Sequence, residues 1–108
     1  MFGLFDSKSE KLVKKAYKIQ RELLASHLRV LNNKTSEFWI KYCFETGENF
    51  MEILMEIKKE CGNKYLQNLE KNLEFEAKNS KYQFSEDEIE QVQDLVNKYK
   101  MKNGIFRL

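Results

Sequence analysis

The chain of 108 residues contains no proline and only four glycines. Proline makes up about 5% of an average protein. It breaks the interior of a helix because its ring removes a backbone donor and clashes with the preceding turn. A proline-free chain of this length favours long uninterrupted helices around one hydrophobic core. We therefore expect residues 1–108 to fold as a single helical domain.

Start and stop signals divide the chain into four predicted helices. Ser7 with Glu10, and Ser85 with Glu88, have the spacing of a capping box. Gly62 stands where a residue of left-handed conformation ends a helix. Because the connections are short, we predict an all-α fold, a four-helix antiparallel bundle with apolar N- and C-terminal tails. The predicted helices cover residues of about 7–31, 36–61, 63–78 and 85–102.

The second predicted helix contains the densest group of apolar and aromatic residues, and Gly47 lies in its middle. At about 100° per residue, the polar residues before and after Gly47 fall on the same side of one continuous helix. A strand is excluded because the apolar residues do not alternate. Glycine costs about 1 kcal/mol relative to alanine inside a helix. We therefore expect one continuous helix, with close approach of a neighbouring helix at Gly47.

Apolar side chains cover most of the circumference of this helix in its first half. Phe38, Trp39 and Tyr42 occupy one arc, whereas Ile40 and Phe44 occupy another. We expect one arc to be core and the other to meet the chain's own apolar ends or a second molecule. In the third helix one aromatic residue points away from the apolar stripe, near Tyr82 and Phe84 of the following loop. The candidate partner-binding residues are Phe38, Trp39, Ile40, Phe44 and Phe75.

Both ends of the chain are apolar. Two interpretations remain open: the ends pack on each other and plug one end of the bundle, or one of them docks on a partner. The residues concerned are Met1, Phe2, Leu4, Phe5, Ile105, Phe106 and Leu108.

The first predicted helix has a basic side. Residues 1–34 carry a net charge of +5 and residues 35–108 a net charge of −3. Such asymmetry is typical of a solvated face or of an anion-binding surface for nucleic acid or an anionic membrane. Phosphate binding should weaken steeply with salt, whereas contact through aromatic residues should not. The candidate residues of this basic face are Lys11, Lys14, Lys18, Arg21 and Arg29.

The sequence argues against catalysis. It has one histidine, His27, and no glycine-rich phosphate loop, whereas triads and metal sites need several such groups. Cys43 and Cys61 lie on one predicted helix, about 27 Å apart by rise, so we expect two reduced thiols and no shared metal. We predict no catalytic residue, no metal ligand and no cofactor.

Gln20 and His27 fall within the apolar face of the first helix, two turns apart. Buried polar groups need hydrogen-bond partners. We expect the hydroxyl of Tyr42, Tyr65 or Tyr99 to serve, which would fix the register of the helices. Ligation of a haem or metal by His27 is the alternative, although no second histidine supports it.

We predict a small non-enzymatic helical protein that acts by protein–protein interaction. Its partner is a second copy, as in a homodimer, or another protein of the kind that inhibitors, immunity proteins and adaptors bind. The alternative is an anion-surface binder using the basic side of the first helix. The segment MFGLF is shorter than the apolar region of a signal peptide, and no stretch is apolar enough to span a membrane. We expect a cytoplasmic protein, and its bias toward lysine and asparagine is typical of a low-GC bacterium or phage.

Overall fold

The structure, a computed structural model, describes residues 7–105, and within that range it contains four α-helices and no strand. The helices are α1 (Lys8–Asn32), α2 (Glu37–Cys61), α3 (Asn63–Lys78) and α4 (Glu86–Lys102). The predicted all-α fold of four helices is confirmed. The predicted apolar tails fall mostly on residues 1–6 and 106–108, which lie outside the described residues. Of the tail residues, Ile105 is described and is half-buried.

Side-chain caps begin three of the helices. The hydroxyls of Ser7 and Ser36 accept hydrogen bonds from backbone amides three residues on, at 3.1 and 3.4 Å. Ser85 and Glu88 form a complete capping box, with arms of 2.8 and 3.1 Å. Gly62 has φ of +93°, which a residue with a side chain adopts only with strain, and it separates α2 from α3. These local signals explain why the observed helix boundaries lie so close to the predicted ones.

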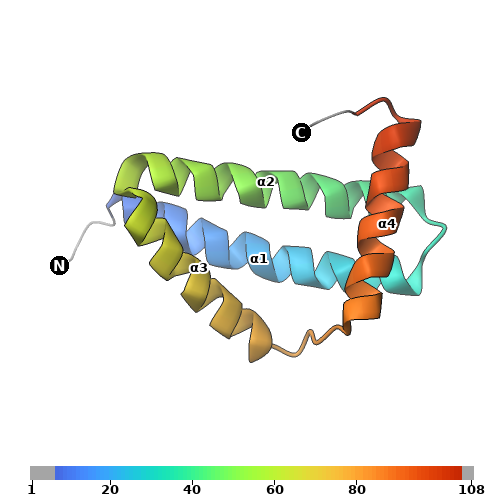
Figure 1. Cartoon of the computed structure of the whole chain (residues 1–108), viewed down its shortest axis with the longest axis horizontal. Helices are drawn as coiled ribbons and strands as arrows, with labels where there is room; N and C mark the ends of the chain where they lie inside the picture. The colour runs from blue at the N-terminus through green and yellow to red at the C-terminus, as the bar shows by residue number, and fades with distance from the viewer. Residues whose placement is uncertain (1–6, 106–108) are drawn as a thin grey trace.

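The antiparallel pair α1 and α2 forms the frame of the molecule (Figure 1). The shorter helix α3 runs obliquely along one half of this pair, and α4 crosses both helices at the other half (Figure 1). Within residues 7–105, α3 and α4 each contact α1 and α2 but not each other. The reason is length: α1 and α2 have 25 residues each, whereas α3 has 16 and covers only part of the pair. The arrangement thus differs from a bundle of four nearly parallel axes.

The core is divided in the same way. Under α3 the buried residues are Leu12, Ala16, Leu54, Ile57, Leu66, Leu69 and Leu73. Under α4 they are Val30, Ile40, Cys43 and Val92. Each short helix therefore closes its own half of the α1–α2 hairpin.

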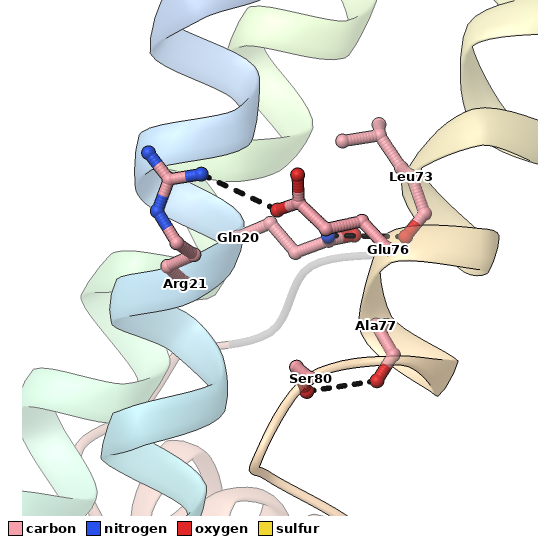
Figure 2. A network of polar contacts seen from close by, with 6 residues as sticks. All are labelled: Gln20, Arg21, Leu73, Glu76, Ala77 and Ser80. Atoms are coloured by element: carbon pink, nitrogen blue, oxygen red, sulfur yellow. Dashed lines mark hydrogen bonds and ion pairs between the residues drawn. The ribbon is translucent and has the colours of Figure 1, made fainter.

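Polar contacts tie α3 to α1 (Figure 2). The buried Gln20 side chain donates from Nε2 to the backbone oxygen of Leu73 at 3.1 Å. Next to it, Arg21 pairs with Glu76 at 3.3 Å. His27 lies with Nδ1 2.9 Å from the backbone oxygen of its own helix at Leu23. The prediction that tyrosine hydroxyls satisfy Gln20 and His27 is therefore wrong, because backbone carbonyls do so.

Gly47 lies inside an unbroken α2, as predicted. A Cβ added there would meet Leu23 Cδ1 of α1 at 3.8 Å, which is ordinary van der Waals contact. The expected close approach of a neighbouring helix is therefore not tight.

Cys43 and Cys61 of the same helix are both free thiols, so the prediction of no disulfide between them is confirmed. Between residues 7 and 105, no helix is long and apolar enough to cross a membrane.

Candidate functional site

The two apolar arcs at the start of α2 differ in burial, because α4 covers one of them and the other is exposed. Ile40 is 6% exposed and packs with Val30 and Val92 in the core under α4. Phe44 is half-buried, with its ring centre 5.9 Å from that of Tyr99 on α4. The arc of Ile40 and Phe44 is therefore covered by α4. This corrects the assignment of Ile40 as a partner-binding residue, because its side chain is not accessible to a partner.

The other arc forms an exposed aromatic surface, made of Phe38, Trp39 and Tyr42. Phe38 is 67% exposed and Tyr42 is 39% exposed, while Trp39 between them is half-buried. The Trp39 ring makes edge-to-face contacts with Phe38 at 5.0 Å and with Tyr42 at 5.8 Å between ring centres. Aromatic pairs favour this edge-to-face geometry. The three side chains of the aromatic surface therefore already contact one another without a partner.

Arg29 of α1 completes this surface. Its guanidinium carbon lies 5.2 Å from the centre of the Trp39 ring, within the range of a cation–π contact. Beside it, Glu37 pairs with Lys102 at 2.6 Å, and this hydrogen bond raises the pKa of Lys102. The ion pair joins the first turn of α2 to the last turn of α4, and both of its side chains are exposed to solvent.

Phe75 is the other strongly exposed aromatic residue, at 69%. It lines a shallow groove of about 630 Å³ together with Tyr17 of α1 and Tyr82 of the loop between α3 and α4. The Phe84 ring instead lies 5.8 Å from His27 on α1. The patch predicted from Phe75, Tyr82 and Phe84 is thus divided, and no ring contact of Phe75 matches those of the aromatic surface in the described part of the chain.

A second groove, of about 490 Å³, lies where α1, α2 and α4 meet and is lined by His27, Cys43 and Gly47, among others. The thiol of Cys43 is 3.8 Å from Nδ1 of His27. Because a carbonyl only accepts, Nδ1 must donate its proton to the Leu23 oxygen and cannot take one from the thiol. Burial also raises the pKa of Cys43, an effect that Ser26 partly offsets. The pair therefore lacks the features of an activated nucleophile.

The five candidates of the basic face, Lys11, Lys14, Lys18, Arg21 and Arg29, are all exposed along α1. Their surroundings are not uniformly basic. Arg21 pairs with Glu76 of α3, and Arg29 lies on Trp39. At the start of the helix, Lys8 pairs with Glu60 at 3.3 Å. Carboxylates from neighbouring helices thus interrupt the basic face, while Arg29 joins it to the aromatic surface.

Sequence reasoning placed Tyr42 on the same arc as Phe38 and Trp39 but left it out of the candidate partner-binding residues, and offered its hydroxyl as one of three possible partners of Gln20 and His27. The signal was present, since Phe38 and Tyr42 are four residues apart and therefore neighbours on one side of a helix.

Among residues 7–105 no group of three or more histidine, cysteine or acidic side chains is placed to hold a metal ion. No family model matches the chain, and neither a curated protein nor a solved structure matches it.

Proposed function

We propose that the chain is a non-enzymatic protein-interaction module that binds its partner through the aromatic surface of Phe38, Trp39 and Tyr42. The observation that carries this proposal is the exposure of Phe38 at 67% within a set of rings that are already in mutual contact. Tryptophan, tyrosine and arginine dominate the energetic centres of protein interfaces. Trp39, Tyr42 and Arg29 bring those three residue types together at one end of the hairpin.

Preorganisation adds to this support. Association costs free energy because flexible side chains at the interface must be ordered. Phe38 and Tyr42 each contact Trp39, and Arg29 covers the Trp39 ring, so little ordering is left to be done on binding. The Phe75 side chain is equally exposed but has no such ring contacts among the described residues, and is therefore the weaker candidate.

Anion binding through the basic side of α1 has less support. Arg21 and Lys8 are each paired with a glutamate, and Arg29 is engaged with Trp39.

Site-specific photo-crosslinking tests the proposal. A benzophenone amino acid replaces Phe38 in one variant and Phe75 in a matched control, since the two side chains are 67% and 69% exposed. Both variants are irradiated in cells of the source organism. We expect a discrete protein adduct from position 38 and none from position 75. Equal adducts from both positions, or none from position 38, would contradict the proposal.

A further inference from the structure

The α1–α2 hairpin has an outer face, which carries a groove that neither α3 nor α4 lines. This shallow groove of about 350 Å³ runs along the face between Lys18 of α1 and Glu52 of α2, and only residues of these two helices line it. Lys18 and Arg29 are eleven residues apart, about three helical turns, and so lie on one side of α1. The outer face therefore extends from this groove to the aromatic surface.

The two helices keep one register along this face. Arg29 lies on Trp39 at the loop end of the hairpin, and Lys8 pairs with Glu60 at its open end. Figure 1 shows α1 and α2 side by side over this whole length. A position on α1 is therefore level with a defined position on α2, which fixes what a partner lying along the hairpin can reach.

The charges of the two helices are opposite. Helix α1 has seven basic and two acidic residues, a net charge of +5, and α2 has three basic and six acidic residues, a net charge of −3. The exposed residues that set the predominant charges of the outer face are Lys11, Lys15 and Lys18 on α1 and Glu45, Glu52 and Glu56 on α2. Each side also carries opposite charges, since Glu22 of α1 lines the groove and Lys41 and Lys59 lie on the same side of α2 as the glutamates. A predominantly basic strip thus runs beside a predominantly acidic strip.

Such a face is complementary to itself. A twofold axis parallel to the hairpin places α1 of one copy over α2 of the other, so that basic strips meet acidic strips twice. The alternative twofold axis, across the hairpin, places α1 on α1 and is disfavoured by like charges. We propose that a second copy of this chain binds the outer face about the first axis. This inference rests on the proposed function and names its partner.

The same symmetry gives the aromatic surface a role. With α1 over α2 in the shared register, Lys18 of one copy is level with Glu52 of the other, and Phe38 of one copy covers α1 of the other near Arg29. Surface ion pairs contribute little affinity but select the orientation of binding. Burial of the two Phe38 rings supplies the apolar contact that the charged strips lack.

Two charge-reversal variants of the full chain test this arrangement. The first carries Lys15→Glu and Lys18→Glu on α1, and the second carries Glu52→Lys and Glu56→Lys on α2; all four positions are exposed. In either variant, the reversed positions of one copy face side chains of the same sign on the other copy of a homodimer. We expect the wild type to dimerise and each variant alone to self-associate at least tenfold more weakly. Circular dichroism should show unchanged helix content.

Mixing the two variants should restore a 1:1 heterodimer, seen by native mass spectrometry when one variant is labelled with ¹⁵N. Repulsion within a chain cannot be relieved by mixing, so recovery shows contact between chains. As matched controls, Lys64→Glu with Lys71→Glu and Glu70→Lys with Glu74→Lys change exposed charges on α3 and should leave the dimer intact. A wild type of 13.0 kDa at all concentrations, or variants that dimerise like the wild type, would overturn the inference. An adduct with a different protein from position 38 would then still uphold the proposed function.

Discussion

The guanidinium of Arg29 lies 5.2 Å from the centre of the Trp39 ring and joins the ends of α1 and α2 beside the loop that connects them. Through this contact the most aromatic part of α2 meets the basic side of α1. The pair therefore links the two candidate surfaces that the sequence presents separately. It also makes the sole tryptophan of the chain part of the proposed interface.

Gly47→Ala should stabilise the protein. The new Cβ would lie 3.8 Å from Leu23 Cδ1, without a clash, and alanine is favoured over glycine in a helix by about 1 kcal/mol. The urea midpoint of unfolding should therefore rise. Gly62→Ala is the contrasting variant, because φ of +93° there strains any residue with a side chain, and its midpoint should fall. A lower midpoint for Gly47→Ala would show that the helices are closer than described.

Gln20→Ala should loosen α3. Gln20 is 8% exposed and its amide donates to the Leu73 oxygen, so its removal leaves a gap and takes away a contact between α1 and α3. We expect a loss of about 1–3 kcal/mol in the free energy of unfolding. Because α3 does not contact α4, hydrogen exchange should accelerate in α3 and stay slow in α4. Uniform acceleration across both helices would contradict this division.

Phe44→Asp and Phe38→Asp should differ in their effect on stability. Phe44 packs on Tyr99 of α4, so a carboxylate there should cost about 1–3 kcal/mol and weaken the attachment of α4. Phe38 is 67% exposed, so the same change should alter the free energy of unfolding by less than about 0.5 kcal/mol. Thermal or urea unfolding of both variants measures the difference, and equal losses would count against the assignment of the two arcs.

Cys43 and Cys61 should react differently with thiol reagents. Burial raises the pKa of Cys43, so at neutral pH it stays a protonated and inaccessible thiol, whereas Cys61 is partly exposed. Peptide mapping after brief treatment with a maleimide should find Cys61 modified first. In urea both should react, which serves as the control. Equal rates in the folded protein would refute the burial of Cys43.

The raised pKa of Cys43 also makes the stability of the folded protein depend on pH. The folded state holds the thiol proton more tightly than the unfolded chain does. This contribution to stability is complete below the ordinary thiol pKa of about 8.5 and is lost as pH rises through the raised value.

The helices could be predicted from the sequence because their boundaries depend on local chemistry. Ser85 with Glu88, and Gly62 with its positive φ, act through neighbouring residues alone. The packing of α4 could not be predicted in this way. A helical wheel shows that Ile40 and Phe38 lie on different sides of α2, but not which side another helix covers. That outcome depends on Val92 and Tyr99, which contact α2 only after α4 crosses the hairpin.

The partners of Gln20 and His27 were beyond prediction for a related reason. Both side chains bond to backbone oxygens, which every residue carries, so no sequence pattern marks Leu73 or Leu23 as the acceptor. The aromatic surface was only partly foreseen, because Tyr42 fits a core and a surface equally well until the place of α1 is known.

The most direct test of the account is the molar mass of the wild type, Phe38→Ala and Phe75→Ala, measured by light scattering over a range of concentrations. Phe38 and Phe75 are about equally exposed, so the two variants remove similar apolar surface. We predict that the wild type and Phe75→Ala rise from 13.0 kDa toward twice that mass as concentration increases, while Phe38→Ala stays at 13.0 kDa. Three identical mass curves would contradict the binding of a second copy through Phe38.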